Sequence, residues 1–158
     1  MASTYSSDLK LELITTGEKA GTWGTITNTN LQQLEQAASG YISHNIGAAD
    51  LALDLSNGAV SNGKNLYFKL TGTLTANRTM TMPDGAERVF VVEDGTARSS
   101  SNYTLTVKTV SGTGLALPIG STTLLYSDGT NITGKLQTKG YYTPSATYTA
   151  VNGDQVLV

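Results

Sequence analysis

The chain has 158 residues, of which 14% are charged, and its formal net charge at pH 7 is −2. The ten basic residues are scattered and form no basic stripe, so we expect no nucleic-acid partner. The absence of cysteine excludes disulfides and thiolate metal sites, and no apolar run reaches the roughly 18–20 residues that span a bilayer. We therefore expect one ordinary domain, or one domain with a small appendage, and no membrane insertion.

The composition is rich in small turn-forming and β-branched residues, with 25 threonines and 17 glycines. Such a composition is typical of short strands joined by tight turns. We predict a mainly β protein in three parts. Residues 1–41 form an extended arm, a Gly/Trp turn and one short helix, residues 42–136 form an antiparallel β-sandwich or barrel, and residues 137–158 form a linker and the start of a further strand.

The chain begins with a polar segment, residues 1–8, which we predict to be an extended arm. Residues 9–14 then alternate between apolar and polar side chains. Alternation with a period of two indicates a strand, with Leu9, Leu11 and Leu13 on one face.

The only tryptophan, Trp23, follows Gly17 and Gly21 and directly precedes Gly24. Glycine allows backbone turns that side chains would hinder, so we expect Trp23 to be presented on a bent backbone. A tryptophan ring buries roughly 150–250 Å². Either it closes the core of the β domain, or it fills a pocket on a neighbouring chain.

A short helix is predicted to follow, capped by Thr29 or Asn30 and ended by Gly40. Its apolar stripe has spacings of three, four and three residues and consists of Leu31, Leu34, Ala38 and Tyr41. A helix of roughly ten residues is unstable alone in water. It must therefore pack on its own β domain or on symmetry copies of itself.

In residues 42–136, about seven to nine short strands are separated by turn signals every 8–12 residues, which is the pattern of an antiparallel sandwich or barrel. The most apolar strand, residues 88–93, is predicted to be buried on both faces. Residues 122–126 and 131–136 flank Asp128-Gly129 and are predicted to pair as a hairpin. Residues 137–147 read as a polar linker and residues 148–158 as a last strand.

Residues suited to catalysis are sparse, so we expect no enzymatic activity, no catalytic residues, no cofactor and no metal. The chain has a single histidine, His44, which we expect at a surface or sheet edge. Asp50 and Asp54 fit a solvated strand face, while Asp84 and Asp128 each precede a glycine and fit turns.

The N-terminal motifs at residues 5–14, 17–24 and 28–31 resemble the N-terminus of bacteriophage tail-fibre-like virion proteins, especially marine and cyanobacterial ones. The resemblance is dense over residues 5–41 and looser to about residue 136. Residues 148–158 resemble the opening of another common fibre repeat. The resemblance implies a structural, non-enzymatic protein that is usually a homotrimer, assembled in the host cytoplasm and located in the virion, at the tail rather than the capsid surface.

We therefore predict a tail-fibre or fibre-like virion component that docks through its N-terminal region to a tail, baseplate or adaptor protein. The alternatives are a capsid decoration or cement protein on the major capsid protein, and a module that binds a host surface glycan. The predicted virion-docking or oligomer contacts are Leu9, Leu11, Leu13, Gly21, Trp23, Gly24, Asn28, Asn30, Leu31, Leu34 and Tyr41.

Overall fold

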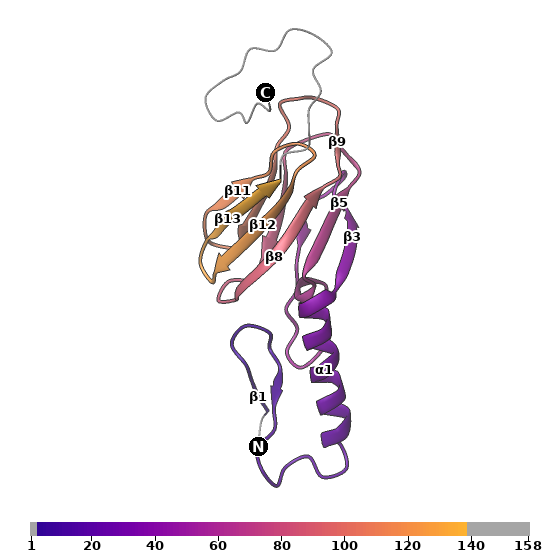
Figure 1. The fold of residues 1–158 in the computed structure, drawn as a ribbon, viewed down its shortest axis with the longest axis vertical. Helices are drawn as coiled ribbons and strands as arrows, with labels where there is room; N and C mark the ends of the chain where they lie inside the picture. Colours follow the sequence, from indigo (N-terminus) through magenta and orange to yellow (C-terminus); the bar gives the residue numbers. More distant parts are fainter. Residues whose placement is uncertain (1–2, 139–158) are drawn as a thin grey trace, which may run out of the picture.

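The computed structural model describes residues 3–138, and these are mainly β with one α-helix, as predicted. Helix α1 (Trp23–Ser39) projects from one end of the stacked sheets, and a small hairpin of β1 (Thr4–Tyr5) and β2 (Glu12–Leu13) lies beside it (Figure 1). The described strands form open sheets and no closed barrel. The barrel alternative is therefore wrong for this part of the chain.

Two larger sheets make up the β module. The five-stranded sheet has the order β13-β12-β8-β5-β3, with β13 (Ile132–Thr138), β12 (Thr122–Asp128), β8 (Glu87–Asp94), β5 (Tyr67–Thr71) and β3 (Tyr41–Asn45). The four-stranded sheet has the order β11-β10-β7-β4, with β11 (Gly114–Ala116), β10 (Leu105–Thr109), β7 (Arg78–Met82) and β4 (Leu51–Ala52). Two short strands, β6 (Thr73–Leu74) and β9 (Ala97–Arg98), form a separate two-stranded sheet, and Leu74 is buried in the same core.

The prediction of an antiparallel module is wrong, because most neighbouring strands run in parallel. Tyr41 of β3 lies beside Tyr67 of β5, which lies beside Val91 of β8, and all three strands run in the same direction. The pairs β4–β7, β7–β10 and β6–β9 are parallel as well. The chain passes from one sheet to the other between these strands, so sequence neighbours are not sheet neighbours. Turn signals predict where a strand ends but not where the next strand lies.

Antiparallel pairing is found towards the C-terminal end of the module. The hairpin predicted across Asp128-Gly129 is confirmed as β12 and β13, which have a register irregularity between Leu124 and Leu125. This irregularity has the form of a β-bulge, which adds local twist to an edge of the sheet.

The buried residues of the two sheets form one core cluster. Phe68 of β5 packs edge-on against Phe90 of β8, with ring centroids 5.9 Å apart. Met80 of β7 and Val107 of β10, in the other sheet, are also fully buried. The prediction that β8 is buried on both faces is wrong: Val89 is 49% exposed, since no described element covers the outer face of this strand.

The N-terminal segment also differs from the prediction, because residues 3–13 fold back as a hairpin where an extended arm followed by a strand was expected. Of residues 9–14, only Glu12 and Leu13 are in a strand. Lys10 has a φ of 56°, a left-handed conformation that interrupts an extended chain. Leu9, Leu11 and Leu13 therefore do not line one face of a single strand.

Helix α1 spans 17 residues and begins at Trp23, well before the predicted start at Thr29 or Asn30. Those two residues lie inside the helix and do not cap it, and Thr22 at the N-cap makes no side-chain capping bond. Gly24 and the β-branched residues after it have weak helix propensity, which explains why the sequence suggested a later start. The predicted end at Gly40 is confirmed.

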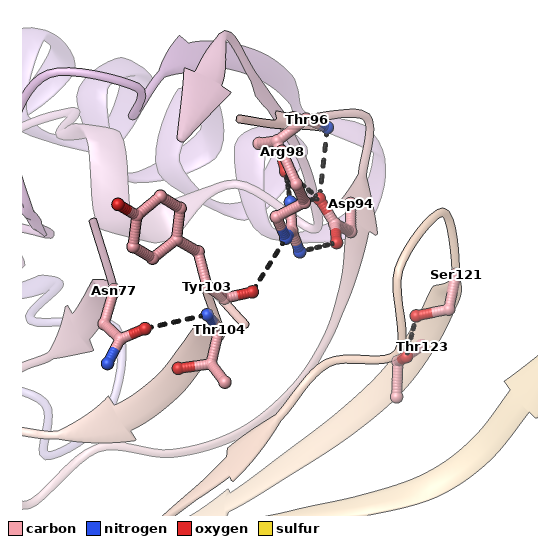
Figure 2. A network of polar contacts seen from close by, with 8 residues as sticks. All are labelled: Asn77, Asp94, Thr96, Arg98, Tyr103, Thr104, Ser121 and Thr123. Atoms are coloured by element: carbon pink, nitrogen blue, oxygen red, sulfur yellow. Dashed lines mark hydrogen bonds and ion pairs between the residues drawn. The ribbon is translucent and has the colours of Figure 1, made fainter. Parts of the chain in front are cut away.

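A buried polar network lies at the end of the module remote from α1, where β8 leads into β9 (Figures 1 and 2). Arg98 Nη2 forms an ion pair with Asp94 Oδ2 at 2.5 Å, and both side chains are almost completely buried. Thr96 donates its backbone N–H and its hydroxyl to Asp94 Oδ1. Arg98 Nε also donates to the carbonyl of Tyr103 at 3.2 Å, so the network joins β9 to the loop that precedes β10.

Candidate assembly surface

Helix α1 holds the N-terminal hairpin through one side chain. Asn30 Nδ2 donates to the carbonyl of Glu12 at 2.8 Å, and Asn30 Oδ1 accepts from the backbone N–H of Glu12 at 3.1 Å. The Glu12 carboxylate accepts from Ser3 Oγ at 2.6 Å and pairs with Lys19 Nζ at 3.1 Å. The hydrogen bond from Ser3, together with Lys19, lowers the pKa of Glu12. The hairpin is therefore fixed to the helix by polar contacts.

The same side of the helix is joined to the β module through Gln33, which is fully buried. Lys64 Nζ donates to Gln33 Oε1 and also to the carbonyls of Ser56 and Ala59, each at 2.6 Å. Burial lowers the pKa of Lys64 to about 8, although the negative charge of Asp54 opposes the shift. A buried ammonium group thus connects the helix to two loop carbonyls.

Arg88 of β8 supports this junction from the sheet. Its guanidinium donates to the carbonyls of Gly63, Lys64 and Asn65, which include part of the short 3₁₀ turn Asn62–Lys64. Burial lowers the pKa of Arg88 to about 10. Gln33, Lys64 and Arg88 were not predicted from the sequence. The alternation of β8, which places Arg88 on the same face as Phe90, was the signal that could have found one of them.

The helical residues of the predicted apolar stripe are exposed, but its last member, Tyr41, lies beyond the helix end as the first residue of β3. Leu31 is 56% exposed, Leu34 is 43% exposed and Tyr41 is 59% exposed. Trp23, the first residue of the helix, is 61% exposed. The interpretation of Trp23 as a core residue is therefore wrong, because the glycine-containing turn leads into a helix that projects away from the core (Figure 1).

The remaining predicted contact residues do not join this stripe into one surface. Gly21 adopts a left-handed φ of 82° in the turn before the helix, and Gly24 is half-buried in the first helical turn. Asn28 is exposed, whereas Asn30 faces the hairpin. Leu9 and Leu11 are half-buried in the hairpin segment, and Leu13 is 50% exposed.

A second apolar area, which the sequence analysis missed, lies on the outer face of the five-stranded sheet. Tyr41 stacks on Tyr67 with ring centroids 5.7 Å apart. The register then places Val91 beside Tyr67 and Leu124 beside Val91. One row of outward positions thus crosses four strands with apolar or aromatic side chains.

The next row along the same face is polar. Lys69 Nζ and Glu93 Oε1 form an ion pair at 2.8 Å, and the Tyr67 hydroxyl donates to Glu93 Oε2 at 2.8 Å. Burial, followed by the hydrogen bond to Glu93, raises the pKa of Tyr67. The apolar row is therefore bounded by charge on the side away from the helix.

Several acidic side chains serve turns and loops. Asp84 Oδ1 accepts from the backbone N–H of Ser111, and Asp128 Oδ1 accepts from those of Thr130 and Asn131. Asp50 Oδ1 accepts from the backbone N–H of Thr79 at 3.0 Å. His44 lies on β3, which is an edge of the described sheet. Within residues 3–138 there is no cluster of three or more His, Cys, Asp or Glu side chains that could hold a metal ion.

In the part of the chain that the structure describes, no helix is long and apolar enough to cross a membrane. Comparisons of the chain with protein-family models, with curated proteins and with solved structures found no match.

Proposed function

We propose that this chain is a bacteriophage virion structural protein, a tail-fibre or fibre-like component that docks to the particle through its N-terminal region and assembles as a homotrimer. The observation that carries the proposal is that apolar side chains of α1, including Leu31 and Leu34, are exposed on a helix with a single charged residue, Glu35. Such a helix is typical of a surface that another chain covers.

The hairpin beside the helix adds further exposed apolar area. Tyr5 is 37% exposed and Ile14 is 36% exposed, and the hairpin that holds Tyr5 lies beside α1 (Figure 1). A large ring such as that of Trp23 is well suited to fill a pocket on a virion partner. We therefore assign docking to the hairpin and to Trp23.

The activity in this proposal is assembly without catalysis. The module of two larger sheets acts as a sandwich-like body that carries the chain outward from the docking end. The N-terminal resemblance over residues 5–41 supports a position at the near end of a fibre, and the exposed apolar residues support contacts with other chains.

Purified virions provide the test. Mass spectrometry should detect the chain in particles, and gold-labelled antibody should mark the tail. A label on the head would instead favour a capsid decoration protein, and an absence from particles together with binding to host polysaccharide would favour a glycan-binding module.

The variant Trp23→Ala should be lost from particles while the protein remains folded. Ile119→Ala, at an equally exposed apolar residue in the β module, is the matched control, because Ile119 is 61% exposed. Normal incorporation of Trp23→Ala would contradict the proposed docking role.

A further inference from the structure

We infer that α1 packs against further copies of this same chain in a parallel arrangement, and that the contact continues from the helix onto the outer face of the five-stranded sheet. This inference rests on the proposed function, because it names the partner and the surface of the oligomer. The surface, called here the apolar strip, consists of Leu31, Leu34, Ala38, Tyr41, Tyr67 and Val91.

The first argument is continuity between the helix and the sheet. Only Gly40 separates the last helical residue from Tyr41, the first residue of β3. The stack of Tyr41 on Tyr67 carries the strip onto β5, and the register carries it on to Val91. On α1 the strip runs from Leu31 to Ala38, about 10 Å along the helix axis at 1.5 Å per residue. The sheet part crosses strands about 4.8 Å apart. A continuous apolar strip of this kind indicates an interaction surface, whereas apolar residues scattered singly on a surface do not.

The second argument is that the module leaves this side of the helix uncovered. The side-chain hydrogen bonds that join α1 to the hairpin and to the loops before β5 come from Asn30, Gln33 and Gln36. Leu31 lies roughly opposite Gln33 and Gln36 on the helical wheel. Leu34, four residues after Asn30, lies at the border of the side that faces the hairpin, and both leucines are exposed. Most of the stability of a protein helix comes from packing of its apolar face, so this helix needs a partner there.

The absence of charged residues from the strip indicates that the partner is a further copy of this chain. Contacts around a symmetry axis bring identical side chains together, and identical charges would repel. The strip contains no charged residue, and Glu35 is the only charge on the helix. The helical positions Leu31, Leu34 and Ala38 also follow the three- and four-residue spacing at which parallel helices pack knobs into holes. Further copies of this chain can therefore cover the strip, and no partner with complementary charges is required.

The arrangement of helix and sheets along the molecule determines the relative direction of the copies. The helix and the sheets follow one another along the long axis of the molecule (Figure 1). Parallel copies place helix beside helix and sheet beside sheet, so both parts of the strip are covered together. Antiparallel copies would pair the helices and leave the sheet part exposed.

Disulfide trapping tests the direction, because the natural sequence has no cysteine. In the full 158-residue chain, Ala38→Cys places a thiol within the strip, and Ser39→Cys places one at the neighbouring exposed position outside it. In a parallel seam the Cα atoms at position 38 come within the about 4.4–6.8 Å that a disulfide spans. Mild oxidation should give covalent dimers with Ala38→Cys and few with Ser39→Cys. Equal cross-linking of the two, or none with Ala38→Cys, would overturn the parallel seam.

Light scattering tests the surface itself. The natural chain should have three times its 16.5 kDa mass, and Leu34→Asp or Val89→Asp should give the single-chain mass. Val89 is the next outward residue of β8 beside the strip and is 49% exposed, so a change there does not disturb the core of the single chain. Val110→Asp, at a residue that is 60% exposed outside the strip, should keep the natural mass.

A natural chain that is monomeric, or an oligomer that survives Leu34→Asp, would overturn this inference. Neither result would remove the proposed docking to the virion, because incorporation into particles is measured separately and depends there on Trp23. A monomeric chain would, however, also contradict the homotrimer of the proposed function. Conversely, a chain that forms the oligomer but is absent from particles would refute the proposed function and leave the strip intact.

Discussion

The amide of Asn30 closes both backbone hydrogen bonds of Glu12, donating to its carbonyl at 2.8 Å and accepting from its N–H at 3.1 Å. The side chain of Asn30, in the middle of α1, thus makes the hydrogen bonds to β2 that a neighbouring strand would make. A two-stranded hairpin is at best marginally stable alone in water. We therefore consider this pair to be the main connection between the helix and the N-terminal hairpin.

Asn30→Ala should loosen the hairpin and leave the β module intact. Each lost hydrogen bond contributes about 1 kcal/mol, so amide exchange of residues 3–13 should become about tenfold or more faster. Hydrogen exchange with mass spectrometry measures this change. Asn28→Ala is the matched control, since Asn28 is exposed on the same helix. Unchanged exchange in Asn30→Ala would show that other contacts hold the hairpin.

Lys64→Met should destabilise the junction between α1 and the β module. It removes the donor that serves Gln33 Oε1 and the carbonyls of Ser56 and Ala59, and unpaired buried polar groups cost about 1–3 kcal/mol each. The free energy of unfolding from urea titration measures the loss. A second variant that combines Lys64→Met with Gln33→Leu should recover part of it, because the side-chain oxygen left unpaired is then gone. No difference between the two variants would contradict the assigned pairing.

The dependence of the free energy of unfolding on pH should also reveal the titration of Lys64. Its pKa in the folded state is lowered to about 8, whereas the unfolded side chain titrates near about 10.4. Between these values the unfolded state binds more protons, so the stability of the natural chain should rise with pH and then level off. Lys64→Met should lack this contribution. The difference between the two pH profiles isolates the contribution of Lys64 from those of Arg88 and Lys69. A difference that does not change from pH 8 to 10 would contradict the lowered pKa of Lys64.

The strand segments could be predicted from the sequence because alternation is a local property. The alternation from Tyr67 to Leu70 predicts one buried face, and Phe68 and Leu70 are indeed buried. Partner choice is not local. Whether β5 pairs with β3, β4 or β8 depends on a crossover between sheets, and no turn signal in the sequence specifies it.

The candidate site was predicted in part, for the same reason. Leu31 and Leu34 lie on the predicted stripe because helical spacing is visible in the sequence, whereas Tyr41 lies beyond the helix end, on β3. The outer row through Val91 was missed, since it exists only when parallel strands place Tyr41, Tyr67 and Val91 side by side. The start of α1 at Trp23 was missed because Gly24 and its threonine neighbours disfavour a helix locally.

Arg98→Met should be strongly destabilising, because it leaves the buried carboxylate of Asp94 without its partner. Removing one member of a buried ion pair costs about 3–5 kcal/mol, whereas an exposed pair contributes at most about 1 kcal/mol. Lys69→Met, in the more exposed pair with Glu93, is therefore the control. Arg98→Met combined with Asp94→Asn should recover part of the loss. Equal effects of Arg98→Met and Lys69→Met in denaturant unfolding would contradict the buried network in Figure 2.

Two glycines of the helix region should respond to alanine in opposite directions. At Gly40 the φ is −65°, which alanine adopts freely, but a Cβ would lie 2.6 Å from Asn65 Oδ1 and closer still to the carbonyl of Gln36. Backbone must then move, so Gly40→Ala should lower the melting temperature. At Gly24, in the first turn of the helix, a Cβ would meet nothing within 4 Å, and alanine has a higher helix propensity than glycine. Gly24→Ala should therefore raise the helix content measured by circular dichroism or leave it unchanged. A tolerated Gly40→Ala would mean that the helix does not end against Asn65 as the structure places it.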